Sequence, residues 1–437
     1  MQFSGKILLV TAFVIVVNPV QAQKEYDLLG KGARAAGMAY AFNAIADDAT
    51  AMSWNPAGMV QIKRPEFAFA NVLTTTEYNH IFYSDNDYKP QYNIDYAGLV
   101  YPMKLRRKDL VFGFSFQNRI NYKSAYSTGN DTTLGNSNYK NKVTVNSISI
   151  CAAYSVTRFI GVGFSYNHWF SLGNRSDEYA FYNTRDWSDK IKYPYDQNIV
   201  ETAETYKYSG GNVNAGILLN FTSFHVPLRF ALKYESKFVL KNDYYANYQL
   251  DYQYDNNVDT LRAETYEGIE KYFFPSILSA GISYRFGDYF TIACDYDIRP
   301  FKNNTYSYDY SYVKSETTTH TDTLNHGVFN DVYYLLKDNE NLLQFRIGAE
   351  YIFHPKFALI PVRVGWKNNP TSISDQVSLE QVFARSLNFG TGIIKKHFSI
   401  DLAYERYIYN RDVIILDDQY SEDKIFHFLI LSVIVSL

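Results

Sequence analysis

The segment from Ile148 to Asn167, ISICAAYSVTRFIGVGFSYN, decides the fold. On both sides of its centre at 157–158, large apolar residues alternate with small or polar ones. Alternation with a period of two is typical of a β-strand that has two different faces. A short polar interruption between two such runs predicts a tight hairpin turn. The segment is therefore predicted to form a β-hairpin.

The same unit recurs to the end of the chain, and short connections alternate with long ones. Bacterial outer-membrane barrels have short periplasmic turns and long extracellular loops. The pattern therefore predicts an all-β, 14-stranded antiparallel transmembrane β-barrel with both ends on the periplasmic side. Its strands are expected to begin near Phe67, Tyr92, Leu110, Val143, Phe159, Asn212, Leu228, Ser276, Tyr289, Leu342, Phe357, Arg385, Phe398 and Ile425. The long connections fall near 78–91, 123–142, 171–210, 236–273, 301–340, 367–384 and 409–424.

Composition agrees with a barrel and excludes other classes. The chain has 41 Tyr and 31 Phe among 437 residues, and aromatic residues favour strands and the interfacial girdles of barrels. The net charge of −3 argues against a nucleic-acid partner, which would require a basic face, and none is predicted. A soluble β-sandwich would also show alternating strands, but the regular contrast between long and short connections favours the barrel.

Residues 1–22 have the pattern of a signal peptide. Lys6 precedes a short apolar stretch over Ile7–Val17, and the small-residue site at 20–22 predicts cleavage before Gln23. A signal peptide followed by a barrel predicts the outer membrane of a Gram-negative bacterium, with outer-membrane lipid around the wall.

The faces of the strands are assigned by the cost of burying charge in lipid. An Arg or Lys that faces the bilayer midplane costs about 2–4 kcal/mol, so the face with Arg229, Lys233 and Glu235 is predicted to line the lumen. Carboxylates and basic residues are expected to pair across the inner wall. The same argument turns the following residues inward: Asp295, Asp297, Gln344, Arg346, Glu350, Arg363, Asp401 and Glu405.

The two cysteines, Cys151 and Cys294, are expected to be unpaired thiols on opposite faces of distant strands. No cluster of Cys and His has the spacing of a zinc site, and no metal or cofactor is predicted.

Residues 23–65 break the alternation, and 66–437 form the barrel domain. This N-terminal segment is dense in Ala and Gly, which permit short helices and close packing. A fourteen-stranded lumen is wider than one that its own side chains fill, so the segment is predicted to plug it. Inward-facing wall glycines would let the plug approach: Gly161, Gly163, Gly216, Gly281, Gly348 and Gly365.

Three motifs in this plug carry a family resemblance: Gly32–Gly37, Ala46–Ala51 and Trp54–Met59. Together they resemble the N-terminal hatch of the FadL/TodX-type outer-membrane transporters, whose signature is an Asn-Pro-Ala triplet. The residues that match the hatch motif are Gly32, Gly37, Asp47, Asp48, Asn55, Pro56 and Ala57. The resemblance implies a fourteen-stranded barrel with a hatch of short helices. It also implies passive uptake of long-chain fatty acids or other hydrophobic small molecules, with lateral release beside a kinked third strand.

Within that resemblance, two tryptophans are candidate ligand-binding aromatics, Trp54 in the hatch and Trp169 on the inner wall. Arg229, Lys233 and Arg363 are candidates to bind a carboxylate head group. For each of these residues, a purely structural role in packing or in a lumen ion pair is the alternative.

Asn118 is the candidate for the lateral opening. It follows a run of lipid-facing Leu and Phe residues on the third strand, in the same register. A polar residue at that position marks either a break in the wall or the upper rim of the membrane band.

The sequence also bears on two other functions. Long Tyr- and Asn-rich loops also suit a scaffold barrel that binds a protein partner for secretion or surface attachment. An enzyme such as a lipase is not predicted, because no Ser motif accompanies the histidines and catalysis needs a nucleophile within reach of a base.

Overall fold

The computed structural model describes residues 29–79, 90–121, 124–127, 136–173, 175–182, 197–254, 257–300, 305–318, 321–334, 341–374, 381–415 and 418–437. The predicted signal peptide lies outside these residues and stays a prediction.

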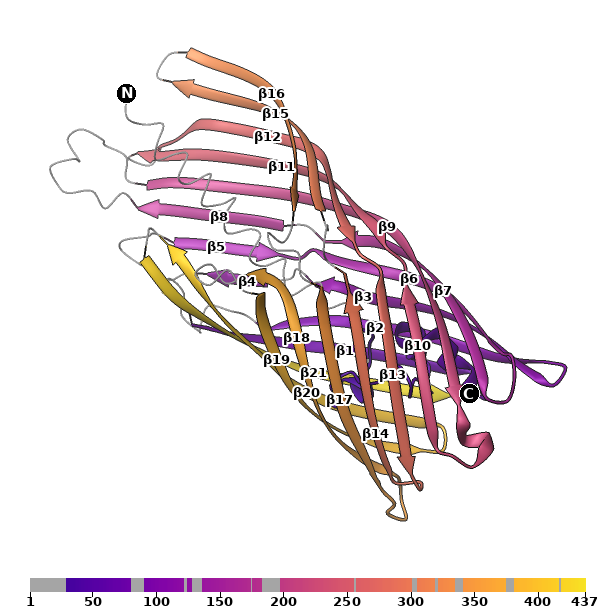
Figure 1. Ribbon diagram of the computed structural model, residues 1–437. Coiled ribbons are helices and arrows are strands. Elements are labelled where there is room, and N and C mark those ends of the chain that lie inside the picture. The colour runs from indigo at the N-terminus through magenta and orange to yellow at the C-terminus, as the bar shows by residue number, and fades with distance from the viewer. Residues whose placement is uncertain are drawn as a thin grey trace.

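Fourteen antiparallel strands form a closed ring, which confirms the predicted barrel (Figure 1). Each ring strand pairs with the next, and β21 pairs with β1 to close the ring. The ring consists, in order, of β1 Glu66–Asn79, β2 Gln91–Leu105, β3 Lys108–Asn121, β6 Thr144–Ser155, β7 Ile160–Leu172, β9 Gln197–Asn220, β10 Leu228–Glu235, β13 Ile277–Phe286, β14 Phe290–Arg299, β17 Leu342–Phe353, β18 Ile360–Ser374, β19 Gln381–Lys395, β20 Phe398–Ile415 and β21 Asp418–Ser436.

Further strands lie inside segments that were predicted only as long connections. They extend the wall beyond one end of the ring, because the first part of β9 pairs with β8 on one side and with β11 on the other (Figure 1). The Tyr- and Thr-rich sequence of these segments favours strands even without lipid on one face. The added strands are β4 Ser124–Ser127, β5 Asn136–Asn141, β8 Arg175–Tyr182, β11 Phe238–Tyr254, β12 Asn257–Phe274, β15 Thr305–Thr318 and β16 Thr321–Tyr334.

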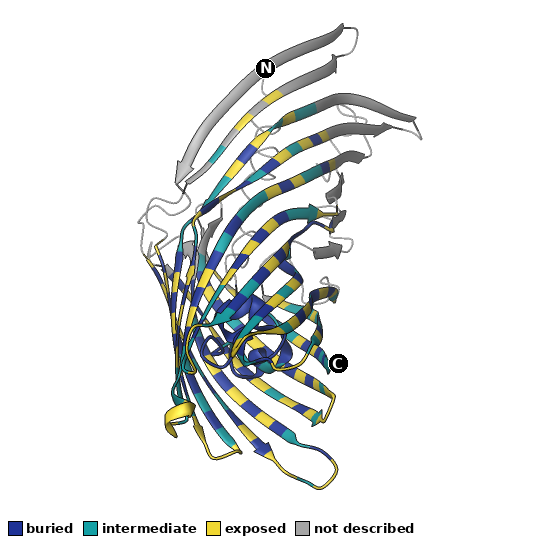
Figure 2. Ribbon diagram, turned by 90° about the vertical axis from the view of Figure 1, so that its right-hand side faces the viewer, coloured by how far each residue is buried: buried dark blue, intermediate teal, exposed yellow. Residues whose placement is uncertain are grey.

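The two faces of the wall differ as the alternation predicts. Buried and exposed residues alternate along the ring strands (Figure 2), and the exposed positions include a band of large apolar side chains. Leu99, Phe114 and Ile150, for example, all point outward and are 47%, 52% and 65% exposed. An apolar outer band around a closed antiparallel ring is the structure of an outer-membrane barrel.

The N-terminal segment fills the lumen, as Figure 2 shows. It contains α2 Ala33–Gly37, α3 Ala51–Trp54 and the 3-10 helix η2 Pro56–Gln61, and most of its residues are buried. A second 3-10 helix, η4 Phe221–Phe224, makes the turn between β9 and β10. None of the helices in the described part of the chain combines the length and apolarity needed to cross a membrane.

Cys151 and Cys294 are unpaired, as predicted. Cys151 is buried on the inner face of β6, whereas Cys294 pairs in register with Ile282 on the outer face of β14. Their positions on opposite faces agree with the sequence prediction.

Candidate functional site

The hatch is seated directly against the backbone of the wall. A Cβ atom added at any of the inward wall glycines would press on the hatch. At Gly163 it would overlap the Pro56–Ala57 backbone, and at Gly348 it would overlap Met38. Because no larger residue fits at such contacts, the glycines allow the hatch to touch the wall. This close approach agrees with the role predicted for the glycines.

The Asn-Pro-Ala triplet joins the hatch to strand β9. The Asn55 side chain accepts a hydrogen bond from the Ala57 amide at 3.0 Å and donates one to the Ile217 carbonyl at 3.2 Å. Pro56 occupies the first turn of η2, where its missing N–H costs nothing. The motif therefore begins a helix and anchors it to the wall at the same point.

A network of ion pairs fixes the other side of the hatch. The Arg34 guanidinium binds both Glu350 oxygens, at 3.1 and 3.0 Å, and Asp47 at 2.7 Å. On the wall, Arg363 binds Glu350 and Asp401, each at 2.6 Å.

Two of the predicted carboxylate-binding residues lie in this network. Arg363 is fully buried between two carboxylates, and Arg229 reaches Asp47 at 3.4 Å. Their positive charge is therefore matched by protein carboxylates. A role in ligand binding stays a prediction for both.

Hatch residues Asp47 and Asp48 are adjacent but titrate differently. Burial alone would raise the pKa of Asp47, but Arg34 and Arg229 bring it below its ordinary value. Burial raises the pKa of Asp48, and Arg34 offsets this only in part. Asp48 also accepts hydrogen bonds from the Thr50 amide at 2.9 Å and from the Thr50 hydroxyl at 2.5 Å. The ionised form of Asp47, and not that of Asp48, is therefore the one that the hatch stabilises.

Trp54 lies in the hydrophobic core of the hatch. Its indole donates to the Lys31 carbonyl at 2.9 Å, and its ring lies against Phe42 and Tyr40 at centroid distances of 5.8 and 6.0 Å. Packing thus accounts for its position, and ligand contact stays a prediction.

A polar belt crosses the inner wall beyond the hatch. Lys233 lies 3.5 Å from Glu235, which accepts a hydrogen bond from Asn212 at 2.8 Å. Asn212 in turn accepts from Asn167 at 3.0 Å and from the Trp169 indole at 2.8 Å. Lys233, the third predicted carboxylate-binding residue, is therefore matched by a neighbouring carboxylate.

Next to this belt lies an inner aromatic cluster, which we define as Ile120, Val143, Val145, Trp169, Tyr208, Phe238, Leu240 and Phe274. Trp169 is fully buried there, 4.7 Å from the ring of Phe238, which itself stacks on Phe274 at 4.8 Å. A mostly apolar wall with a few polar groups is typical of sites for small hydrophobic ligands. Packing thus accounts for the position of Trp169 as it does for that of Trp54, and ligand contact stays a prediction for both.

The wall is interrupted beside this cluster. The ladder between β2 and β3 runs from Leu105–Lys108 to Tyr96–Gln117, and the described residues beyond that pair do not continue it. Asp95 of β2 is skipped in the pairing with β1, and Arg119 of β3 is skipped in the pairing with β6. Each strand therefore has a β-bulge where the two separate, and bulges bend strands and end pairing.

Asn118 lies at this interruption, one residue before the bulge. It donates a hydrogen bond to Asn146 of β6 at 3.1 Å and is buried. Its proximity to the break agrees with the predicted location of an opening, and its role there stays a prediction.

Arg119 was not identified from the sequence. Its guanidinium donates to the Ser147 hydroxyl at 2.8 Å and to Asn167 at 3.4 Å, and it lies 5.4 Å from the centre of the Trp169 ring. Within the described ranges Arg119 has no carboxylate partner. The only feature of the sequence that could have singled out Arg119 is its lumen-facing position on the third strand. Many other polar residues of the wall have the same feature.

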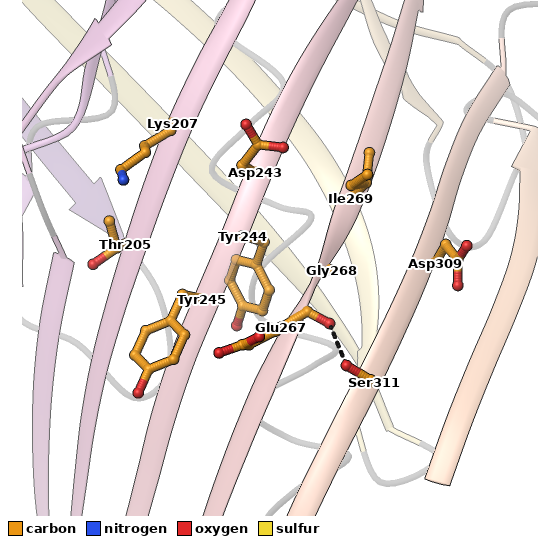
Figure 3. Close-up of a pocket in the computed structure, with 10 residues that line it drawn as sticks. All are labelled: Thr205, Lys207, Asp243, Tyr244, Tyr245, Glu267, Gly268, Ile269, Asp309 and Ser311. Carbon is orange, nitrogen blue, oxygen red and sulfur yellow. Dashed lines mark hydrogen bonds between the residues drawn. The ribbon is translucent and has the colours of Figure 1, made fainter.

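A cavity of about 810 Å³ lies elsewhere, on the extended wall beyond the ring (Figure 3). Its side chains come from four neighbouring strands, β9, β11, β12 and β15, and include Lys207, Asp243, Glu267 and Asp309. Tyr245 also lines it and is exposed, while its neighbour Ala246 on the opposite face is buried. This hollow is on the outer face of the sheet, and charged side chains stand around it.

Comparisons with known proteins give a structural match only. No protein-family model matches the chain, and no curated protein matches it. The structure is similar to the CymD monoaromatic hydrocarbon channel at 16% identity and a TM-score of 0.58, over 94% of this chain and 99% of that one. It is also similar to the Ralstonia pickettii toluene transporter TbuX at 16% identity and a TM-score of 0.59, over 94% and 100% of the two chains.

A third similar structure is a Pseudomonas aeruginosa FadL homologue, at 12% identity and a TM-score of 0.61, over 93% of this chain and 98% of that one. At such low identity these matches show the fold. The predicted resemblance to the FadL/TodX-type transporters is confirmed at that level.

Proposed function

We propose that this chain, which has the fold of the FadL-type transporters, passively admits hydrophobic small molecules through the outer membrane and releases them sideways between β2 and β3. The observation that carries the proposal is the coincidence of a plugged lumen with an interrupted wall. The hatch closes the direct route along the barrel axis, and the ladder between β2 and β3 ends at Tyr96–Gln117.

The inner aromatic cluster supports the hydrophobic character of the ligand. A solute that leaves the water needs an apolar surface on its way to the lipid, and burying such surface gives about 25 cal/mol per Å². The cluster lies beside the bulge, because Ile120 belongs to it and directly follows Arg119. A ligand bound there is adjacent to the opening.

Two polar groups at the opening suit a ligand with a polar head. Arg119 is a buried cation with no carboxylate partner in the described part of the chain. Across the opening, Asn93 of β2 is buried, and neither atom of its amide has a hydrogen-bond partner there. Groups of this kind favour a carboxylate, which accepts charge-assisted bonds from arginine. Because these two groups favour a carboxylate, we propose long-chain fatty acids as the ligands. The structurally similar channels are named for toluene and monoaromatic hydrocarbons.

Uptake of labelled oleate and labelled toluene tests the proposal in cells that carry or lack the protein. Deleting Arg119 removes the bulged residue and restores a regular register between β3 and β6, so uptake of both compounds should fall. The matched variant Arg119→Ala keeps the bulge and should lower only oleate uptake. Unchanged uptake of both compounds in the deletion variant would contradict lateral release.

A scaffold for a protein partner is the second candidate, and one observation favours it. The extended wall formed by β8, β9, β11, β12, β15 and β16 projects beyond the ring, and exposed Tyr245 lies on its outer face (Figure 1). Tyrosine provides large, rigid contacts for recognition. A pull-down in mild detergent distinguishes the two functions, because a stoichiometric protein partner supports the scaffold and copurified small molecules alone support uptake.

A further inference from the structure

The short turns of the barrel carry a local excess of positive charge. The whole chain has a net charge of −3, yet these turns, the strand ends beside them and the segment just before β1 contain only three acidic side chains, Glu66, Asp109 and Asp288. Short turns lie on the periplasmic side of outer-membrane barrels, so the excess belongs to the periplasmic rim. The exposed basic residues there are Lys63, Arg64, Lys104, Arg106, Arg107, Lys108, Arg158, Arg285, Lys356, Lys395 and Lys396.

The excess is greatest on one sector of the rim. This sector spans the start of β1, the turn between β2 and β3, and the turn between β6 and β7, which are consecutive around the ring. We call it the basic quadrant and define it as Lys63, Arg64, Lys104, Arg106, Arg107, Lys108 and Arg158.

Only part of this charge is matched by the protein. Lys63 binds Asp109 at 2.8 Å, and Lys108 donates to the Val156 carbonyl at 2.8 Å. The remaining members of the quadrant are exposed and have no carboxylate partner among the described residues. Like charges held close together repel one another unless anions gather between them. The quadrant is therefore a surface that attracts anions.

The position of the quadrant indicates where those anions come from. Tyr101, Met103 and Leu105 form the outward, lipid-facing row of β2 and lead directly into the basic turn. Leu105, 54% exposed, is immediately followed by Arg106. A basic cluster that adjoins the end of an apolar band lies at the level of the lipid head groups.

We propose that the basic quadrant binds phospholipids with anionic head groups in the periplasmic leaflet of the membrane. The lipid-facing row of β2 holds the acyl chains, and the basic turn pairs with the phosphates. The continuity of the apolar row with the basic turn favours a lipid over an acidic soluble protein, because a lipid contacts both surfaces at once. The site lies below the opening between β2 and β3, so the bound lipid borders the same two strands.

The test is native mass spectrometry of the purified protein in a neutral detergent, titrated with dioleoylphosphatidylglycerol or dioleoylphosphatidylcholine. The wild-type protein should retain the anionic lipid in preference to the zwitterionic one. The triple variant K104Q/R106Q/R107Q should bind phosphatidylglycerol at least about tenfold more weakly, since one basic residue near an anionic surface is worth about fivefold. Phosphatidylcholine binding should not change.

The matched control is K356Q/K395Q/K396Q, which removes the same charge from turns outside the quadrant and should change the affinity less than about threefold. All substituted side chains are exposed, and an unheated gel checks that each variant keeps the compact barrel. Equal losses in the two triple variants, or equal retention of both lipids by the wild type, would overturn the proposal. So would a stoichiometric acidic protein that copurifies with the wild type and is lost from the first variant.

Discussion

Replacing Arg34 by Met tests whether ion pairs hold the hatch in the barrel. Arg34 is the one hatch residue in the described structure that binds Glu350, and its side chain is 21% exposed. Removing one partner of a buried ion pair typically costs 3–5 kcal/mol. Here Glu350 keeps Arg363 at 2.6 Å and Asp47 keeps Arg229 at 3.4 Å. Partial compensation and partial exposure therefore lower the expected cost to about 2–3 kcal/mol.

Hydrogen exchange measured by mass spectrometry gives this free energy for the hatch itself. If the hatch opens as a local unit, a loss of 2–3 kcal/mol speeds the exchange of its peptides by about 30- to 150-fold. The Arg34 guanidinium lies over the Phe42 ring at 5.4 Å, and a Met side chain can pack against the same ring, so the change removes the charge and its cation–π contact while a side chain still covers the ring. Peptides from β11 and β12 serve as internal references, because these paired strands lie away from the hatch and should exchange as in the wild type.

The matched control is Arg229→Met, which removes a single longer contact to the same Asp47. Such partly exposed pairs are worth 0.2–1 kcal/mol, so its hatch peptides should exchange less than about sixfold faster. Equal acceleration in the two variants, or no acceleration with Arg34→Met, would refute the reasoning. The hatch would then be held by packing against the wall glycines and not by charge.

Three further outcomes are expected. At neutral pH, Asp47→Asn should speed hatch exchange, whereas Asp48→Asn should slow it or leave it unchanged, because only Asp47 has a pKa below its ordinary 3.8. A lowered pKa gives stability that is fully present above the ordinary value and is lost as the pH falls through the folded pKa. The Asp47 contribution should therefore begin to fall below pH 3.8 and disappear as the pH falls through the lower pKa of the folded state, in the same exchange assay. Trp169→Ala should cost about 3–5 kcal/mol of local stability and weaken binding of a hydrophobic fluorescent ligand, because it empties the centre of the inner aromatic cluster; unchanged binding would count against the cluster as the pocket. Gly163→Ala should displace η2 and raise ion conductance in planar bilayers, whereas Gly211→Ala, whose added methyl would meet the Tyr166 hydroxyl and not the hatch, should not; similar conductance in the two variants would contradict the seating of the hatch on Gly163.

The ring of strands could be predicted because lipid imposes a simple rule on sequence. A charge on the outer face is costly, so residues such as Lys233 reveal the lumen face without knowledge of any partner strand. The hatch could be predicted because its run of Ala and Gly lacks the alternation of large apolar and polar side chains that a membrane-spanning strand needs. The ends of the strands were harder to predict. Strands β9 and β21 begin well before Asn212 and Ile425, which were the predicted first residues. Outside the membrane no lipid requires apolar residues on the outer face, so the two faces of a strand no longer differ clearly in polarity and the alternation is hard to recognise.

The details of the site depend on which strands meet, and a local pattern does not contain that information. Arg363 was predicted to face the lumen, but its neutralisation follows from its direct pairing with Glu350 across β17 and β18. The bulge at Arg119 is also invisible locally, because a bulge is defined by a residue skipped in the pairing with β6. Alternation alone assigns Ile120 to the lipid face, whereas the bulge turns it into the inner aromatic cluster.

The hatch and the interrupted wall form one mechanical unit, because the hatch is tied to β2 where the ladder ends. Lys31 binds the bulged Asp95 at 2.8 Å, and the Tyr96 hydroxyl donates to the Ala49 carbonyl at 2.6 Å. Tyr96 is also the last residue of β2 that pairs with β3, and Trp54 holds the Lys31 carbonyl. A shift of the hatch core would therefore pull on Asp95 and Tyr96, the two residues of β2 at the end of its ladder with β3. If the hatch were held only by Arg34 and its ion pair with Glu350, it would have no contact with this end of β2. Its movement would then leave β2 unchanged.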